Sequence, residues 1–413
     1  MQRLFRVCAG IDVHKRSIYV CLLRAPAEVA LAGEVRTFGT TTHELLGLLD
    51  WLTQEQCESV AMESTGVYWK PVFNVLEGAL QVVLANAQHV KGLPGRKTDV
   101  QDCEWLAELH LHGLVKPSFI PTPDIRELRE LVRTRTTLTR DRARHVNRIA
   151  KVLEDANLKL GSVASDILGV SGRAMLDAIV AGQTDAAELA ALAVGRLRSK
   201  KTELQQALQG FIKPHHRLLI QTHLKLIDAF DASLAALTVQ IEECMRPFAE
   251  TRERLDEVTG VGPEVATVFI SELGADMTRW PTPAHAASWA GLCPGHHESA
   301  GKHTSGRTRH GNRWIKQAFA QAGWAASRAA GTYMQAHFRR LCSRRGAKKA
   351  VMAVAHSQFI RCVLLSASPG ECYQDLGGDY FDRRNEQHVT QRLVNRLQAL
   401  GYRVTLQPLE PPA

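Results

Sequence analysis

The chain of 413 residues lacks paired cysteines. Its nine cysteines are scattered singly and no C-x-x-C motif occurs. This usage is untypical of a disulfide scaffold and predicts a reducing, cytoplasmic location. We see no apolar run that predicts a membrane span, and a charge follows the N-terminus too soon for the apolar region of a signal peptide. Apolar residues make up 45% of the chain and charged residues 23%, which excludes general disorder.

Acidic residues are nearly absent from one stretch of the chain. Residues 296–349 carry 12 Lys and Arg and a single acidic residue, a local charge of +11 in a chain of net charge +9. Like charges at this density repel one another unless a polyanion lies against them. Because phosphate contacts release condensed counterions, we expect a nucleic acid as the partner. A basic face that is simply solvated is the alternative.

Strands alternate with helical patterns over the first 120 residues. RVCAGIDV (6–13) predicts a buried strand that ends in Asp12, and SVAMES (59–64) predicts another that ends in Glu63. Helical periodicity follows at 43–52, 67–77 and 98–111. The alternation predicts an α/β domain over residues 1–120.

The remaining sequence is predicted to be mostly helical. Over 121–250 we expect a helical, coiled-coil-like linker region, because apolar residues from Ile227 to Cys244 step by three and four positions. A packed helix hairpin explains this seam about as well as a dimer interface does. A mostly α domain is expected over 251–365, followed by a polar tail over 366–413 with a last helix at 391–400.

The segment G-V-G-P (260–263) predicts a tight turn of the helix-hairpin-helix type. Gly260 and Gly262 permit such a turn, and its exposed backbone N–H groups could bind a phosphate of a nucleic acid. Any tight connection between helices would explain the two glycines equally well.

Four acidic residues occupy positions at which they can meet. Asp12 and Glu63 each end a predicted strand, and if the two strands are neighbours in one sheet, both side chains point into one crevice at its edge. Asp99 and Asp102 lie three residues apart at the start of a predicted helix and therefore share one face of it. Such a cluster repels itself unless a cation lies among the carboxylates. Mg²⁺ (or Mn²⁺) suits carboxylates together with substrate phosphate, and two ions about 4 Å apart support phosphodiester chemistry. Singly, each acid could be a turn or capping residue.

The motifs around these acids resemble a known family. G-I-D-V-H-K, A-M-E-S-T-G-x-Y and K-T-D-x-x-D are similar to the first domain of bacterial insertion-sequence transposases of the DEDD type, the IS110 and IS1111 groups. L-D-E-V-T-G-V-G-P, W-A-G-L-C-P and E-S-A-G-K with S-G-R-T-R-H-G-N-R-W resemble the second domain. The resemblance spans residues 7–120 and 250–330. It implies a RuvC-like ribonuclease H fold for 1–120 and metal-binding, catalytic roles for Asp12, Glu63, Asp99 and Asp102.

The same resemblance implies a serine transposase domain over 251–365 with a nucleophilic serine in S-A-G-K, here Ser299. A serine hydroxyl needs a base or a strong field to attack. Phosphate-binding cations follow closely and would offset charge in the transition state: Lys302, Arg307, Arg309 and Arg313. Ser305, in a similar S-G-R context, is the rival nucleophile.

Other residues that could carry chemistry have simpler explanations. Cys293, His296, His297, His303 and His310 are spaced too loosely for us to expect zinc. Aromatic side chains could stack on bases, but we expect them in the core: Trp280, Trp289, Trp314, Trp324, Tyr68 and Trp69.

Together these features predict a transposase that moves an insertion sequence through a phosphoserine intermediate, with Mg²⁺ held by the acidic tetrad. The resemblance further implies DNA (element ends and target) as partner, a noncoding guide RNA encoded by the element, and a homo-oligomer, dimer or tetramer; no membrane is involved, and the bound enzyme would be nucleoid-associated. One alternative is a metal-dependent, structure-selective Holliday-junction endonuclease that does not use Ser299. The other is a non-catalytic nucleic-acid-binding protein.

Overall fold

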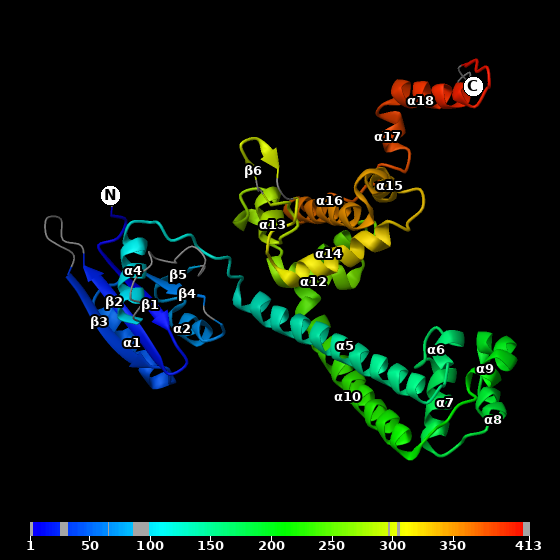
Figure 1. Cartoon of the computed structure of the whole chain (residues 1–413). Helices are drawn as coiled ribbons and strands as arrows, with labels where there is room; N and C mark the ends of the chain where they lie inside the picture. Colours follow the sequence, from blue (N-terminus) through cyan, green and yellow to red (C-terminus); the bar gives the residue numbers. More distant parts are fainter. Residues whose placement is uncertain are drawn as a thin grey trace. The chain divides into compact units, whose positions relative to one another are not determined.

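The computed structural model describes residues 3–24, 32–64, 66–85, 99–295, 298–303 and 306–407. The side chains of residues 32, 299 and 303 are outside this description. Backbone contacts divide the chain into two compact units, Met1–Ile120 and Pro121–Ala413. Figure 1 shows the elements of both units, which are treated one at a time below.

The first unit is built on a five-stranded mixed sheet. Its strands are β1 (Val7–Val13), β2 (Ser17–Arg24), β3 (Ala32–Gly39), β4 (Ser59–Glu63) and β5 (Gln81–Ala85), in the order β3-β2-β1-β4-β5. β2 runs antiparallel to β1 and β3, whereas β4 is parallel to both β1 and β5. This antiparallel meander extended by two parallel strands confirms the ribonuclease H-like fold expected from the sequence.

Helices cover both faces of the sheet. α1 (Thr42–Gln54) and α2 (Trp69–Leu76) lie on one face, where Leu48 and Leu76 share a core with Ile11 and Met62. α4 (Asp99–Leu111) lies on the other face. Strand side chains alternate between the faces, so Cys8 of β1 packs against α4 rather than α1. The near-continuous apolar runs of β1 and β2 are typical of strands buried on both sides.

Two contacts fix α4 on the sheet. A Cβ atom on Gly10 would lie 2.3 Å from the carbonyl oxygen of Cys103 and 2.4 Å from the backbone nitrogen of Ala107, so only glycine allows this approach. Near the other end of α4, His110 Nε2 lies 2.8 Å from Ser59 Oγ, which itself donates to the Gln81 carbonyl. Burial lowers the pKa of His110 to about 4, so the ring is neutral at pH 7.

Gly10→Ala is expected to destabilise the first unit by about 1–3 kcal/mol, the typical cost of an overpacked contact, because its new methyl group must push α4 away from β1. Gly47→Ala is the matched control: Gly47 is exposed in α1 and a Cβ there meets nothing within 4 Å. It should gain about 0.5–1 kcal/mol from helix propensity. Denaturant unfolding measures both, and equal unfolding free energies for the two variants would contradict the packing role of Gly10.

The second unit begins with two long helices that pack side by side. α5 (Pro123–Asp155) lies against α10 (Pro214–Met245). The seam of α10 faces this contact: Ile227 and Ile241 are buried. Short helices connect the two and close a separate core with their ends: α6 (Leu160–Val163), α7 (Val170–Val180), α8 (Ala186–Ala191), η1 (Gly195–Lys200) and α9 (Lys201–Ala207). A helix hairpin thus accounts for the seam, and its role in association stays a prediction.

A helical domain follows α10 and shares one core with the start of α5. Phe269, Phe319 and Phe359 meet edge to face at its centre. The elements of this domain are η2 (Arg246–Phe248), α11 (Ala249–Asp256), α12 (Pro263–Leu273), η3 (Met277–Arg279), α13 (Pro283–Trp289), β6 (Glu298–Ser299), β7 (Lys302–His303), α14 (Arg313–Ala326), α15 (Tyr333–Arg345), α16 (Ala347–Ala367), α17 (Tyr380–Arg383) and α18 (Glu386–Ala399). The three rings come from α12, α14 and α16.

Two expectations from the sequence are corrected here. Trp280 and Trp289 do pack on the core, but Trp324 is 41% exposed and Tyr68 42%, because the surfaces that carry them are not covered by other elements. We also found no apolar run long enough to span a membrane, yet α16 has the length and composition to do so. Over half of its most apolar 18-residue stretch is buried against its neighbours, as in the core helix of a globular domain.

Candidate active site

The strand ends of the first unit bring acidic residues to one edge of the sheet. Asp12 lies on β1 and Glu63 is the last residue of β4. Ile11 is paired with Met62 in parallel register, so the next residues, Asp12 and Glu63, are neighbours. Asp12 is two positions after Gly10 on β1, and Glu63 is two positions after Ala61 on β4, and both Gly10 and Ala61 face α4. The backbone therefore directs both residues to the face covered by α4.

The first turn of α4 adds two more acids to this edge. Asp99 and Asp102 both lie in that turn, where the helix dipole favours negative charge. His14 Nε2 bridges two of the carboxylates, 3.0 Å from Asp12 Oδ2 and 3.3 Å from Asp99 Oδ1. The pKa of Asp12 is raised, first by burial and then by the charges of Asp102 and Asp99, while His14 opposes the shift. Asp12 therefore interacts electrostatically with both acids of α4.

This acidic edge has a donor set that fits a divalent cation. Asp12, His14 and Asp99 each offer a ligand atom, and these atoms lie within 4.8 Å of one another. Hard cations take carboxylate oxygens, and a positive charge here would relieve the repulsion that raises the pKa of Asp12. Asp12 and Asp99 are the carboxylates that would hold it, and His14 lies against both. His14 was not selected from the sequence, although it stands in G-I-D-V-H-K.

In the second unit, S-A-G-K forms the tip of a β-hairpin. Ser299 of β6 is paired with Lys302 of β7, and the two residues between them both have positive φ, 48° for Ala300 and 72° for Gly301. Positive φ at both central positions defines the tight type I′ hairpin turn, and an alanine there is strained. The backbone therefore places Ser299 at the last strand position before a tight turn. Ser305, His296 and His297 lie outside the described residues.

The base of this hairpin is closed by two glycines. A Cβ atom on Gly311 would lie 2.4 Å from the backbone nitrogen of Gly291, which itself has a φ of 73°. Just above them, Gly295 N donates to the Arg307 carbonyl over 2.9 Å. W-A-G-L-C-P and R-H-G-N therefore meet through their backbones, which explains why glycine occurs in both motifs.

The predicted phosphate-binding cations lie on or beside this hairpin. Lys302, Arg307, Arg309 and Arg313 are all exposed. Lys316 Nζ donates to Thr308 Oγ1 and to the Arg309 carbonyl, which ties the hairpin to α14. The Arg313 guanidinium lies 4.6 Å from the centre of the Trp314 ring. Four exposed cations thus follow Ser299 within fourteen residues of the chain.

The glycines of G-V-G-P have different roles in the structure. Gly260 has a φ of 85°, and a Cβ atom on it would lie 2.6 Å from the Ala322 carbonyl of α14. Its packing against α14 alone accounts for that glycine. Gly262 is the N-cap residue of α12, and a Cβ atom there would meet nothing within 4 Å. A phosphate contact at this turn stays a prediction.

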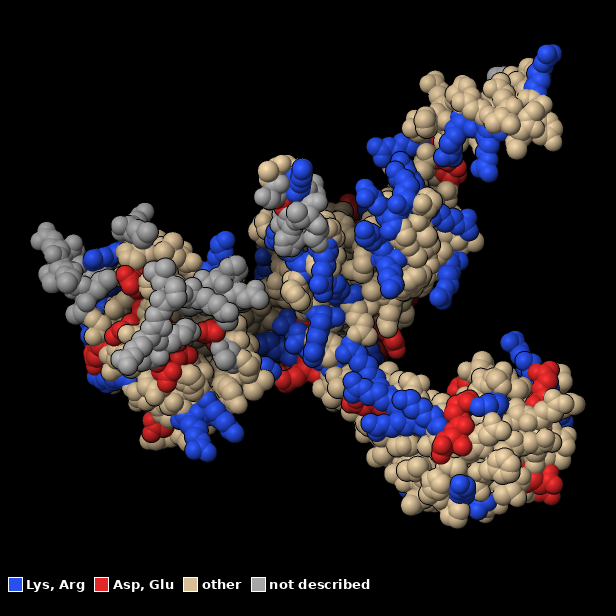
Figure 2. Space-filling model, in the orientation of Figure 1, with Lys and Arg blue, Asp and Glu red and all other residues tan. Residues whose placement is uncertain are grey.

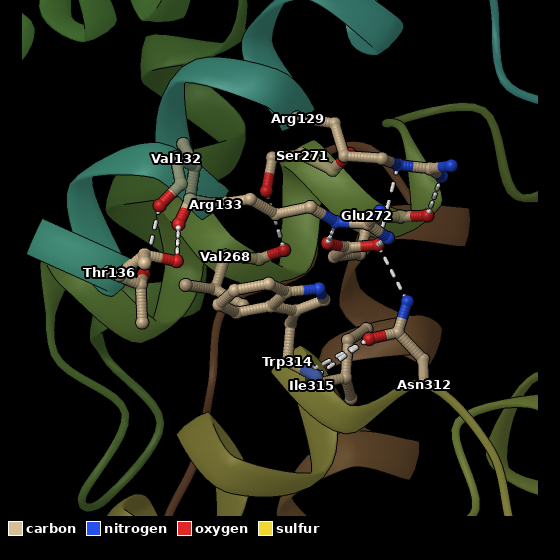
Figure 3. Close-up of polar contacts among 11 residues, drawn as sticks. Arg129, Val132, Arg133, Thr136, Val268, Ser271, Glu272, Asn312, Trp314 and Ile315 are labelled. Carbon is tan, nitrogen blue, oxygen red and sulfur yellow. Dashed lines mark hydrogen bonds and ion pairs between the residues drawn. The ribbon is translucent and has the colours of Figure 1, made fainter. Parts of the chain in front are cut away.

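The structure also reveals a buried acid that the sequence did not single out. Glu272 of α12 is fully buried and accepts two hydrogen bonds from the Arg133 guanidinium, of 2.6 and 2.7 Å (Figure 3). Arg129 lies 3.3 Å from the same carboxylate, and Asn312 Nδ2 donates to it over 2.6 Å. Burial lowers the pKa of Arg129 to about 10, opposed by the charge of Glu272, so Arg129 is charged at pH 7. The sequence signal for such a buried acid was the position of Glu272 within the apolar helical run EVATVFISEL.

Glu272 connects the hairpin to the long helix α5. Asn312, whose amide contacts Glu272, caps α14 by accepting from the backbone nitrogens of Trp314 and Ile315 (Figure 3). It immediately follows Gly311 at the base of the hairpin. A largely buried ion cluster thus joins α5, α12 and α14 beside the base of the hairpin.

Glu272→Gln is expected to lower the free energy of unfolding by about 3–5 kcal/mol, because it leaves the largely buried charge of Arg129, and the partly exposed charge of Arg133, without their anionic partner. Glu264→Gln, an exposed residue in the first turn of the same helix, should change it by less than about 1 kcal/mol. Thermal and denaturant unfolding measure both effects. Equal stability of the two variants would show that Glu272 does not hold this cluster together.

Comparison with known proteins finds matches among family models and among solved structures. Two family models match: the DEDD transposase model of IS110 over residues 9–158, and the transposase IS116/IS110/IS902 family over residues 252–339. Among solved structures, Thermus thermophilus RuvC is 17% identical with a TM-score of 0.22, covering 27% of this chain and 99% of that one. T. thermophilus RuvC in complex with a Holliday junction substrate is 16% identical, also with a TM-score of 0.22, covering 28% and 100%. No curated protein matches the chain.

An acidic edge on a ribonuclease H-like sheet, joined to a transposase domain, defines a DNA-cleaving, recombining enzyme, a transposase. The two matches together span more than half of the chain and carry the same family name. The chain belongs to the IS110 family of DEDD transposases, which confirms the resemblance found in the sequence.

Proposed function

We propose that this transposase cleaves and rejoins DNA through a covalent phosphoserine on Ser299. The serine oxygen attacks a DNA phosphodiester, the P–O bond to one strand breaks, and that strand leaves as a free hydroxyl. A hydroxyl of the strand to be joined then attacks the phosphoserine, and the serine takes back a proton. Since the energy of the phosphodiester is kept in the intermediate, rejoining needs no other energy source.

The observation that supports this proposal best is the tip of the hairpin. A strained two-residue turn presents the S-A-G-K motif among exposed cations, and backbone strain of this kind clusters at functional sites. Lys302, Arg307, Arg309 and Arg313 would bind the phosphate and offset the negative charge of a pentacovalent transition state. Gly260 and Gly262 would add a backbone contact to a neighbouring phosphate.

The acidic edge supplies the second part of the proposal. Asp12, Glu63, Asp99 and Asp102 would hold Mg²⁺ (or Mn²⁺), which when bound polarises the phosphate and stabilises its leaving oxygen. His14 contacts two of these carboxylates and would orient them. We further propose that copies of the chain assemble and bring an acidic edge and a hairpin to one scissile bond.

The wider organisation belongs to the same proposal. We assign 1–120 to the RuvC-like domain, 121–250 to a coiled-coil linker that aids oligomer formation, 251–365 to the serine transposase domain and 366–413 to a tail. The charge of +11 over 296–349 supports a large polyanion as partner, so we include an element-encoded noncoding guide RNA besides the DNA. A cytoplasmic, nucleoid-associated location follows from these partners.

Trapping the intermediate tests the proposal. The full chain is incubated with labelled element-end DNA, RNA transcribed from the element and Mg²⁺, then denatured and digested with trypsin. Cleavage after Arg279, Lys302 and Arg307 separates Ser299, in peptide 280–302, from Ser305, in peptide 303–307. We expect a nucleotide adduct on peptide 280–302. An adduct on 303–307 would transfer the role to Ser305, and DNA cleavage without any adduct would favour a metal-dependent junction endonuclease.

A further inference from the structure

A large groove in the second unit lies outside both parts of the proposed active site. It encloses about 1540 Å³ between α15 on one side and residues 377–392, with α17 and α18, on the other. Five arginines line it: Arg339, Arg340 and Arg344 from α15, and Arg384 and Arg392 from the opposite wall. In Figure 2, blue Lys and Arg side chains gather over the region of α15. The transposase family model ends at residue 339, at the edge of this groove.

The two walls of the groove are fastened to each other by polar contacts. Asp375 Oδ1 accepts from the backbone nitrogen of Tyr333 at the start of α15 over 2.8 Å, and Asp375 Oδ2 accepts from the Tyr373 hydroxyl over 2.9 Å. The backbone of Gly378 packs on Gly331, since a Cβ atom there would lie 3.1 Å from the Gly331 carbonyl carbon. The segment before α17 is therefore docked on the domain.

Aromatic stacking completes the connection between the walls. The Phe381 ring of α17 stacks on Tyr333, with centroids 5.4 Å apart, and on His337 at 5.9 Å. The Arg340 guanidinium covers the same ring at 4.7 Å. These contacts hold Arg384, three residues beyond Phe381, opposite α15. The groove is thus a built feature of the fold.

The charges in the groove are unbalanced. All five arginines are exposed, and within the described residues none of them forms an ion pair with a carboxylate. Two acids also line the groove. Asp379 pairs with Arg383 at 3.0 Å, outside the set of five, and Asp382 is exposed. Guanidinium groups bind phosphate oxygens in bidentate geometry, so an excess of arginines on both walls favours a chain of phosphates.

The dimensions favour a polymer over a small anion. Pockets for small molecules typically enclose about 300–1000 Å³ and are mostly apolar, whereas this groove is larger and lined chiefly by charged and polar groups. A single phosphate would contact only two or three guanidiniums, leaving the others unneutralised.

We propose that this groove binds the phosphodiester backbone of a nucleic acid, as an anchoring site apart from the hairpin of Ser299. The choice of partner rests on the proposed function, because a transposase handles nucleic acid throughout its reaction. The groove itself makes no chemical step. It holds a DNA or RNA segment by charge, and without regard to base sequence.

The test compares two triple variants of the full chain that lose the same charge. Arg339→Ala/Arg344→Ala/Arg392→Ala removes three of the five arginines from the groove, and Arg196→Ala/Arg198→Ala/Lys200→Ala removes three exposed cations from η1. Fluorescence anisotropy measures binding of duplex DNA, single-stranded DNA and structured RNA of equal length over a salt series. Each lost phosphate contact lowers the slope of log K against log salt by about 0.9 for duplex DNA and about 0.7 for single strands.

For at least one probe we expect the groove variant to bind at least about tenfold more weakly, with a slope smaller by about 2 to 3. The η1 variant should keep wild-type binding, and the Arg→Lys version of the groove triple should keep the slope. The probe most affected identifies the bound nucleic acid. Unchanged binding of all three probes, or an equal loss in the η1 variant, would overturn the proposal.

Further measurements distinguish loss of binding in the groove from unfolding of the variant and from failure of the phosphoserine mechanism. Thermal unfolding checks the fold, and Arg392→Ala alone repeats the test on α18, which has no buried residues. At saturating DNA the groove variant should still form the adduct on peptide 280–302. A wild-type protein that binds through the groove but forms no adduct would contradict the phosphoserine mechanism and leave the groove proposal intact.

Discussion

Ser299→Ala is expected to abolish the covalent DNA adduct and to lower strand transfer by at least about 10³-fold, the scale on which removal of a catalytic nucleophile acts. The substitution deletes a single oxygen at a strand position beside the turn and removes no cation, so DNA binding should stay close to that of the wild type. Adduct formation on denaturing gels and strand transfer between labelled duplexes give the two readouts.

Ser305→Ala is the control for this variant, because it lies in a similar S-G-R segment six residues away. We expect it to keep most of the activity. Cleavage and rejoining of DNA by Ser299→Ala at the wild-type rate would favour metal-activated water as the nucleophile, the mechanism of the endonuclease alternative. Loss of DNA binding in Ser299→Ala would mean instead that the hairpin has collapsed.

Asp12→Asn is expected to lower DNA cleavage by at least about 10²-fold, since a divalent cation contributes several kcal/mol to the stabilisation of a phosphoryl transition state. The change is nearly isosteric but removes the carboxylate that His14 bridges to Asp99. Asp50→Asn, on the exposed face of α1, is the matched control and should be fully active. Cleavage over a Mg²⁺ titration measures both.

The raised pKa of Asp12 also predicts how the metal site depends on pH. Because burial and the neighbouring acids raise its pKa, Asp12 accepts a proton at a higher pH than an ordinary aspartate. Because metal ligands must be deprotonated, Mg²⁺ binding at low metal concentration should therefore weaken on acidification earlier than carboxylates of ordinary pKa would cause. An Asp12→Asn enzyme with undiminished strand exchange would support the non-catalytic alternative, in which the acids are structural.

Sequence alone predicted the first unit well because its signals are local. Strand patterns that end in Asp12 and Glu63, and an i, i+3 pair at a helix start, are readable without any knowledge of neighbours. Parallel strand ends then meet at one edge of a sheet by geometry. His14 escaped notice because its role depends on two side chains that the fold brings together, one of them 85 residues away.

The second unit was less predictable because its contacts join distant segments. Gly291 and Gly311 must be glycines because their backbones pack against each other. Glu272 pairs with two arginines of α5 that lie 139 and 143 residues earlier in the chain. The arginine groove combines residues 339–344 with residues 384–392 through the docking of Asp375 and Phe381. Periodicity assigns helices to such segments but does not show which of them pack together.

The glycine contact at the base of the hairpin has a consequence for how this enzyme could be re-engineered. A segment that is joined to its domain by backbone against backbone places little demand on the side chains within it. Residues 294–307 should therefore be exchangeable between relatives as a cassette, provided that Gly291, Gly311, the buried Leu292 and Thr308, which Lys316 contacts, are retained. Replacing either glycine by a larger residue should prevent the exchanged segment from docking.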